Sequence, residues 1–101
     1  MLLPLLVNTR SAMSIRDEFV LCVIAAVASA GGEGYCVAAV IAGATSASLS
    51  TYTGDTPTMA YNYLIDVAEA TSDARVQRCA ERAASGLLRG GATRTETVPV
   101  A

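Results

Sequence analysis

Residues 35–57, YCVAAVIAGATSASLSTYTGDTP, form the stretch around which we expect the rest of the chain to fold. No charged residue occurs in it before Asp55. Gly43 lies near its middle, and a glycine takes the left-handed backbone of a sharp turn without strain. The pattern predicts a short helix over 35–43, a turn, and another helix over 47–53, which together make a helix-turn-helix. A small residue, the turn glycine and two inward apolar side chains fill the four positions that this motif restricts: Ala39, Gly43, Leu49 and Tyr52.

The apolar run Phe19–Ala30 precedes this stretch. It is apolar on every face, so periodicity does not separate a buried helix from a buried strand. Its valines and the glycines that follow it favour a hairpin with Tyr35–Ile41 as the partner strand. Its four alanines favour a helix, and so does the capping box that Ser14 and Asp17 form just before it. We predict the helix.

Two further helices are expected after the turn Gly54–Pro57. Thr58–Ala70 has apolar residues at helical spacing, and Thr71–Asp73 then breaks the chain and caps a last helix over Ala74–Leu88. In that last helix the residues expected to face inward are Val76, Cys79, Ala80, Ala83 and Leu87, whereas Arg75, Arg78 and Arg82 lie on another face.

The fold class that follows is mainly α: a small helical bundle with a helix-turn-helix and an extended or strand-like C-terminal segment. The length of 101 residues suits one domain with a working core. We expect a single helical domain over 14–91, a disordered or frayed apolar extension over 1–13, and an extended tail over 92–101.

The composition argues against enzymatic chemistry. The chain has no His, which removes the usual general base and the commonest metal ligand, and no Lys, which removes any phosphate-binding loop of the Gly-Lys-Ser type. Its three cysteines are far apart and cannot assemble a four-ligand zinc site. We therefore predict that the protein is not an enzyme and that it uses no cofactor and no metal.

Charge is distributed unevenly along the chain. Residues 1–74 contain two arginines and seven acidic residues, whereas residues 75–101 contain five arginines and two acidic residues. If the protein meets a phosphate backbone, the C-terminal quarter is the part that does so. The plainer interpretation of the same arginines is a solvated helix face followed by a polar tail.

The N-terminal third leaves the compartment open. Ala28-Ser29-Ala30 follows an apolar run and matches a signal-peptidase cleavage pattern, and cleavage there would leave Cys36 and Cys79 to form one disulfide in a secreted domain. However, Asp17 and Glu18 precede the run, where a signal peptide carries positive charge. We expect a cytoplasmic protein with reduced, buried cysteines, and no membrane span, because the uncharged run 19–32 is too short for one.

Residues 35–70 resemble the headpiece of the LacI family of repressors. That headpiece has the order Ala-Gly, a residue, Ser, a residue, Ala-Thr-Val-Ser, and Ala42–Ser50 reads AGATSASLS, with Pro57 at the distance at which the family has a proline. The family's Tyr-Arg-Pro-Asn stretch and its ligand domain are absent. The resemblance implies a DNA-binding repressor whose second helix enters the major groove. The residues that would face the bases are Ser46, Ser48, Ser50 and Thr51.

A second register is suggested by electrostatics, because the first has no Arg or Lys on its recognition helix to contact guanine or phosphate. Here Asp66–Thr71 is the positioning helix, Ser72–Ser85 the recognition helix, and Gly86–Val100 a wing. This looks like the winged-helix pattern, although the turn is short and has no glycine. The register brings five arginines to DNA: Arg75, Arg78, Arg82, Arg89 and Arg94.

The leading functional hypothesis is a small helix-turn-helix transcription regulator that binds double-stranded DNA as a homodimer. One alternative is a helical interaction module, such as an antitoxin or inhibitor, that docks a protein partner through small-residue faces. The other alternative is a secreted or membrane-active protein cleaved after Ala30. The small residues that would contact a protein partner are Ala25, Ala28, Ala38 and Ala42.

Overall fold

Helices account for the regular structure of the residues that the computed structural model describes, 13–32 and 34–92, and no strand occurs among them. The mainly α helical bundle expected from the sequence is therefore confirmed. Residues 1–12 of the disordered or apolar extension expected over 1–13, and residues 93–101 of the extended tail expected over 92–101, lie outside the described residues. In chain order the elements are α2 (Ile15–Ser29), α3 (Gly34–Ser46), the 3-10 turn η1 (Leu49–Thr51), α4 (Thr56–Ala70) and α5 (Ala74–Arg89).

Helix α2 begins where the sequence predicts. The Ser14 side chain accepts a hydrogen bond from the backbone N–H of Asp17 at 3.1 Å, which satisfies one of the free amides of the first turn. Asp17 and Glu18 lie in that turn, where negative charge is favourable. The choice of helix over strand for this segment is confirmed.

Asp55 and Asp73 begin the last two helices. The Asp55 carboxylate accepts from the N–H of Thr58 at 2.8 Å, and that of Asp73 accepts from the N–H of Arg75 at 2.8 Å. Pro57 lies in the first turn of α4, where its fixed backbone angle suits a helix start. The predicted helices over 58–70 and 74–88 are thus confirmed, with boundaries that differ by one or two residues.

The centre of the core is a group of three aromatic rings. The Phe19 ring meets the Tyr63 ring edge to face, with 5.5 Å between centroids, and stacks on Tyr52 at 6.2 Å. The Tyr63 hydroxyl donates to the backbone carbonyl of Val40 at 2.6 Å, and burial raises the pKa of Tyr63 to about 12, so this hydroxyl stays protonated at neutral pH. Tyr52 donates to the Asp66 carboxylate at 2.7 Å. One aromatic group therefore joins α2, α3 and α4.

The turn expected at Gly43 does not exist, because α3 continues through that residue to Ser46. The glycine serves close packing: a Cβ at this position would overlap the Tyr63 hydroxyl. The helix expected over 47–53 is also wrong, since that segment contains only the 3-10 turn at Leu49–Thr51. The described residues therefore do not form a helix-turn-helix around Gly43.

The other positions of the expected motif also have different roles. Ala39 is exposed on α3 and packs against no second helix of a helix-turn-helix, whereas Leu49 and Tyr52 are half-buried against the core. The C-terminal end of α3 is capped by the side chain of Arg16, from α2, and not by a glycine. Its guanidinium donates to three carbonyls at the end of that helix and just after it, those of Ala44 at 3.2 Å, Thr45 at 3.1 Å and Ala47 at 2.7 Å.

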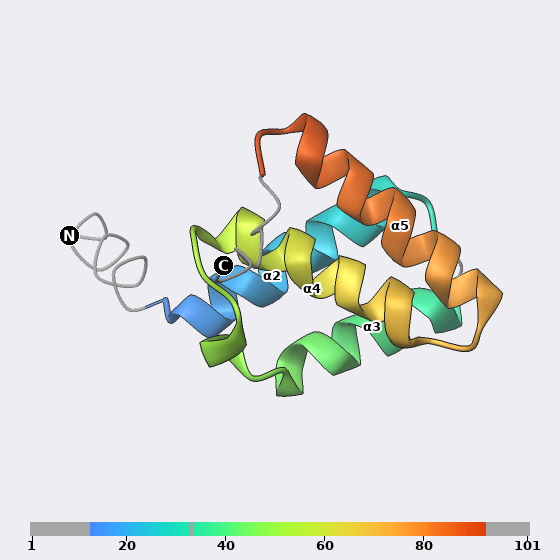
Figure 1. The fold of residues 1–101 in the computed structure, drawn as a ribbon, viewed down its shortest axis with the longest axis horizontal. Helices are drawn as coiled ribbons and strands as arrows, with labels where there is room; N and C mark the ends of the chain where they lie inside the picture. Colours follow the sequence, from blue (N-terminus) through green and yellow to red (C-terminus); the bar gives the residue numbers. More distant parts are fainter. Residues whose placement is uncertain (1–12, 33, 93–101) are drawn as a thin grey trace, which may run out of the picture.

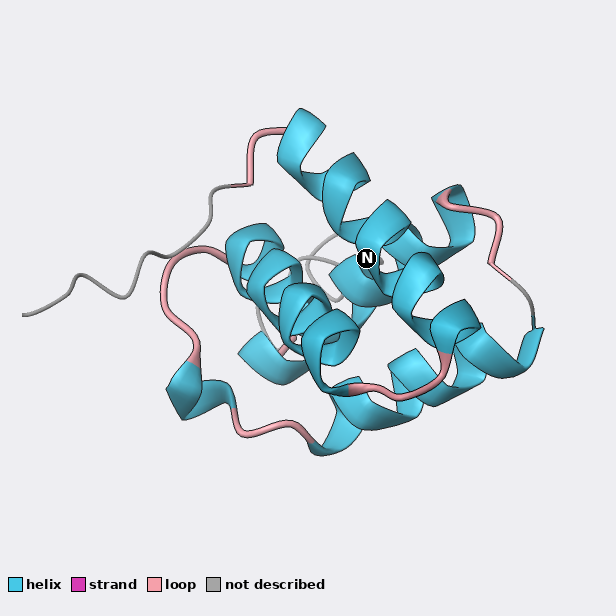
Figure 2. Ribbon diagram, turned by 45° about the vertical axis from the view of Figure 1, so that its right-hand side comes forward, coloured by secondary structure: helices cyan, strands magenta, loops and turns pink. Residues whose placement is uncertain are grey.

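The arrangement of the helices separates two ends of the bundle (Figure 1). The turn between α2 and α3 lies beside α5 at one end, and η1 follows the far end of α3. Figure 2 shows α4 and α5 as neighbours joined by a short loop, which consists of Thr71, Ser72 and Asp73. No helix within 13–32 and 34–92 is long and apolar enough to cross a membrane.

Candidate nucleic-acid interface

Helix α5 has two chemically different sides. One side packs against the bundle, with Val76, Cys79, Ala80, Ala83 and Ala84 all buried. Four arginines and one acidic residue, Glu81, are the charged side chains of this helix, and all five are exposed. The residues expected to face inward do so, although Leu87 is only half-buried.

The four arginines of α5 share one face of the helix. They are Arg75, Arg78, Arg82 and Arg89. Since each residue turns an α-helix by about 100°, their Cα atoms fall within an arc of about 60°. The first and last are fourteen residues apart, which corresponds to about 21 Å along the axis. We call this row of exposed guanidinium groups the arginine face.

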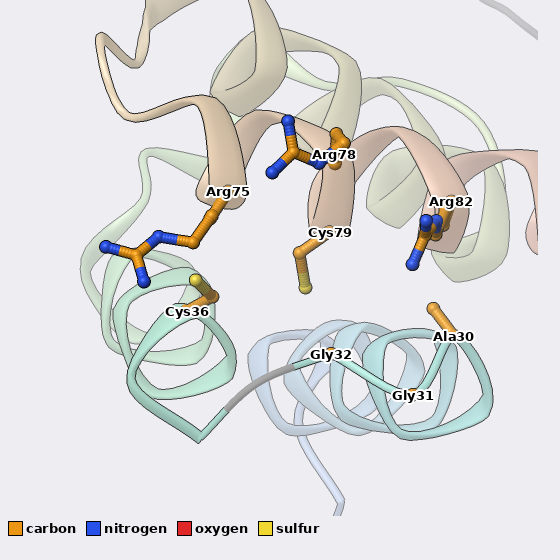
Figure 3. Close-up of a pocket in the computed structure, with 8 residues that line it drawn as sticks. All are labelled: Ala30, Gly31, Gly32, Cys36, Arg75, Arg78, Cys79 and Arg82. Carbon is orange, nitrogen blue, oxygen red and sulfur yellow. The ribbon is translucent and has the colours of Figure 1, made fainter.

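A cavity, which we call the arginine cavity, lies where the arginine face meets the turn between α2 and α3. Its volume is about 190 Å³. Figure 3 shows Arg75 and Arg82 on either side of Cys79, with the Gly31–Gly32 turn facing them from α2. The residues that line it are Ala30, Gly31, Gly32, Cys36, Arg75, Arg78, Cys79 and Arg82.

The two cysteines of this cavity are buried free thiols from α3 and α5. Burial raises the pKa of the Cys79 thiol, and the neighbouring Cys36 thiol acts in the same direction, so Cys79 adds no negative charge to the cavity at neutral pH. Arg82 has a smaller, opposite effect on that pKa. The electrostatic character of the cavity is therefore set by its arginines.

A second hollow extends the same face toward the end of α5. Ser29 and Ala30 from the end of α2 line it together with Glu81, Arg82, Ser85 and Arg89. Ala30 and Arg82 line both hollows, so the two are adjacent along α5. Glu81 is the acidic residue at this part of the face.

Arg75 is held at the start of the arginine face. Its guanidinium lies 4.9 Å from the centre of the Tyr35 ring, and the Tyr35 hydroxyl donates to Asp73 at 3.2 Å. The pKa of Asp73 is lowered, first by the hydrogen bond from the Arg75 backbone N–H. Asp73 therefore stays ionised as the cap of α5, and its charge is satisfied by the helix that carries the arginines.

The serines and threonine expected at a DNA groove lie elsewhere. Ser46 ends α3, ten residues and about 15 Å along the helix from Cys36, which lines the arginine cavity. Ser48, Ser50 and Thr51 lie in or beside η1, where Ser48 and Ser50 contact each other at 3.0 Å and Thr51 donates to the Ser48 carbonyl at 2.7 Å. These hydrogen bonds are local turn contacts. The structure does not bring the two sets of predicted site residues together.

The second register agrees with the structure in part. The three-residue link between α4 and α5 has the length of a helix-turn-helix turn. The helix that this register predicts as the recognition helix is longer than expected, because Gly86–Arg89 belong to α5 and not to a wing. Residues 93–100 of the expected wing, with Arg94, lie outside the described residues.

Sequence reasoning missed the contribution of Gly31 and Gly32. In the sequence these glycines only favour a hairpin after the apolar run, yet they form a wall of the arginine cavity. A Cβ at Gly32 would lie 2.6 Å from the Cys79 sulfur, so close packing against α5 requires glycine there. No local pattern signals a contact between residues so far apart in the chain.

Helix α2 also exposes an apolar stripe. Leu21, Ile24, Ala25 and Ala28 follow the spacing of one helical face, and Leu21 is 50% exposed. On α3, Ala38, Ala39 and Ala42 are exposed in the same pattern. The small residues expected to contact a partner are therefore at the surface.

Comparison of the chain with protein-family models, with curated proteins and with solved structures found no match in any of the three.

Proposed function

We propose that the protein is a small DNA-binding regulator that contacts the phosphate backbone through the arginine face of α5. The observation that carries the proposal is the confinement of Arg75, Arg78, Arg82 and Arg89 to one exposed face about 21 Å long. Duplex DNA carries one negative charge per roughly 1.7 Å of its axis, so several phosphates fall within that length. Guanidinium groups bind phosphate through paired hydrogen bonds as well as through charge.

The charge of the rest of the chain also favours a DNA contact that is confined to the arginine face. The chain as a whole has a formal net charge of −2, and residues 1–74 contain most of its acidic side chains. Such a molecule has no general attraction for DNA, and its arginine face is where the attraction is concentrated. The proposal does not require Ser46, Ser48, Ser50 or Thr51.

The test is the salt dependence of binding to a fluorescently labelled DNA duplex, measured by anisotropy between about 50 and 200 mM NaCl. If all four arginines neutralise a phosphate, the logarithm of the affinity falls against that of the salt concentration with a slope of about −3.6. The triple variant R75A/R78A/R82A is expected to lose most of the affinity and about three units of the slope.

Gln77→Ala is the matched control, because Gln77 is exposed on α5 but lies outside the arginine face. Circular dichroism confirms that each variant remains helical. Absence of salt-dependent binding by the wild-type protein at low salt would overturn the proposal. So would a folded triple variant that binds DNA as tightly as the Gln77→Ala control.

A second candidate function, a helical interaction module, is favoured by the apolar stripe of α2. The occupant we propose is a second copy of the chain. A two-fold pair needs one self-complementary surface, and Leu21, Ile24, Ala25 and Ala28 present no charge that a copy of the stripe would have to bury. Sedimentation of the wild-type protein and of L21S/I24S tests it: we expect a dimer that the substitutions dissociate, and a monomeric wild type contradicts it.

The alternative of cleavage after Ala30 has a structural cost. It would remove α2, which supplies Phe19, Val23 and Val27, all with no exposed surface, to the core. Loss of these three side chains would open a large gap between the remaining helices. We therefore propose both candidate functions for the protein with α2 in place.

A further inference from the structure

The residues that line the cavity between the α2–α3 turn and α5 suit a binding site for one phosphate group, which we call the seat. We propose that it binds a single phosphate, held mainly by Arg82, with Arg75 and Arg78 as further cations at the rim. The inference deepens the proposed function, since the phosphate belongs either to a nucleic-acid backbone or to a small free phosphate compound. Both sources present the same chemistry to the site.

The charges around the cavity favour an anion. Among the described residues eight line the cavity, of which three are arginines and none is acidic. The Cys79 thiol beneath them remains neutral, because burial raises its pKa. An anion at this place therefore meets guanidinium groups without a competing carboxylate among the lining residues. Asp73, the acidic residue that caps the start of α5, accepts hydrogen bonds from two backbone amides and from Tyr35.

The size of the cavity restricts what enters. Its volume of about 190 Å³ lies below the roughly 300–1,000 Å³ of sites that enclose a whole drug-sized ligand. A phosphate group fits, whereas a base and sugar would have to remain outside. The arginines of the cavity are exposed to solvent, so a phosphate in the backbone of a long polymer can reach them.

The glycines define the opposite wall. Gly31 has a backbone φ of +68°, which forms the turn, and Gly32 packs so closely on α5 that a Cβ would lie 2.6 Å from the Cys79 sulfur and 3.0 Å from Val37. Nothing lies within 4 Å of the position of a Cβ on Gly31, so an anion can approach the backbone closely at that residue. The same close packing fixes the distance between this wall and the arginines.

The individual arginines differ in their directions. Figure 3 shows Arg82 directed toward Ala30, on the side of the glycine turn. Arg75 lies on the other side of Cys79, and its guanidinium is directed outward past Cys36, where it lies over the Tyr35 ring. Arg78 points away from the turn and would rotate inward to reach a ligand. Arg82 is therefore the residue whose loss most clearly tests the seat, and Arg89, on the same face but outside this cavity, is its matched control.

The experiment titrates inorganic phosphate into the full-length protein at constant ionic strength, with amide chemical shifts as the readout. The expected result is a saturable response at Gly31, Gly32 and Cys36. In Arg82→Ala the affinity should fall by about tenfold or more, as expected for a lost charged hydrogen bond. In Arg89→Ala, which removes an equal charge, it should stay within about twofold, because Arg89 lines the adjoining hollow and not this cavity. A linear, unsaturated response, or equal losses in both variants, would overturn the inference.

A parallel measurement of DNA binding distinguishes failure of this inference from failure of the proposed function. If phosphate competes with the duplex in the wild type but not in Arg82→Ala, the seat holds a backbone phosphate. If phosphate binds saturably while the protein does not bind DNA, the proposed function fails and the seat serves a free phosphate compound. If DNA binds with the expected salt dependence and phosphate shows no saturable response, the seat fails and the proposed function stands.

Discussion

The Tyr63 hydroxyl occupies the space that a side chain on Gly43 would fill. It donates to the carbonyl of Val40, one turn earlier on α3, and the Tyr63 ring is held in place by Phe19. Gly43 thus allows α4 to approach α3 closely, in the middle of a helix where glycine is otherwise unfavourable by about 0.5–1 kcal/mol relative to alanine.

Gly43→Ala should therefore destabilise the protein by about 1–3 kcal/mol, because the added methyl group overpacks the contact with Tyr63. In a Tyr63→Phe background the same substitution should be neutral or stabilising, since the methyl group would then meet the ring carbon at 3.6 Å, an ordinary contact. Denaturant unfolding of the four proteins measures the coupling. Gly86→Ala is the control: a Cβ there would meet only the end of the Arg89 side chain, in ordinary contact at 3.9 Å, and the substitution should stabilise by about 0.5–1 kcal/mol.

Gly43 also shows where sequence reasoning reached its limit. The apolar runs and the caps at Ser14, Asp55 and Asp73 are local signals, and the helices that they predict are present. A glycine, by contrast, has the same local signature whether it makes a turn or a close contact. The partner that distinguishes the two here is Tyr63, twenty residues later, so no pattern within the stretch could reveal the error.

The candidate site likewise has one part that local sequence signals predict and one part that they do not. The spacing of Arg75, Arg78 and Arg82 gave their common face directly, because helical periodicity is local. The cavity beneath them depends on Gly31 and Gly32 packing on α5, more than forty residues away in the chain. The arginine face could be predicted from the sequence, and the glycine wall opposite it could not.

Arg16 should be a stabilising residue that a lysine cannot replace. Its guanidinium reaches the carbonyls of Ala44, Thr45 and Ala47, and α3 has no basic residue of its own in its last turn. Arg16→Ala should lower the free energy of unfolding by about 1–3 kcal/mol, as expected for lost charged hydrogen bonds. Arg16→Lys should restore only part, because an ammonium group does not span three acceptors in this way.

Chemical denaturation measures both effects. Arg89→Ala is the matched control, since it removes an exposed arginine that lies outside the core, and its effect should stay within about 0.5 kcal/mol. Equal losses in Arg16→Ala and Arg89→Ala would contradict a specific role for Arg16 at the end of α3.

Acid should weaken the protein through its two aspartate caps. The pKa of Asp55 is lowered chiefly by the hydrogen bond from the Thr58 backbone, and that of Asp73 chiefly by the one from the Arg75 backbone. A carboxyl group whose pKa is lowered in the folded state stabilises that state above its unfolded pKa, near 3.8 here. This stabilisation is lost as the pH falls below about 4 and passes through the lower folded value.

The double variant D55N/D73N tests this pH dependence. Asparagine caps a helix nearly as well as aspartate but does not titrate, so the melting temperature should change little at pH 7 and fall less than that of the wild type on acidification. Glu69→Gln removes an exposed carboxylate away from any helix start and should leave the acid dependence close to that of the wild type. An unchanged acid transition in D55N/D73N would show that other groups control it.

Glu81→Gln should strengthen DNA binding, the opposite sign from the arginine substitutions. Glu81 is exposed beside Arg82 and Arg89 and carries the only negative charge of α5, so it opposes the approach of a phosphate to that part of the arginine face. The affinity at low salt should rise, while the slope of its salt dependence stays the same, because the number of phosphates neutralised does not change. Glu18→Gln is the matched control: it changes the net charge equally, but its side chain lies in the first turn of α2. If both variants bind DNA equally tightly, net charge alone explains the effect and the arginine face is not the contact surface.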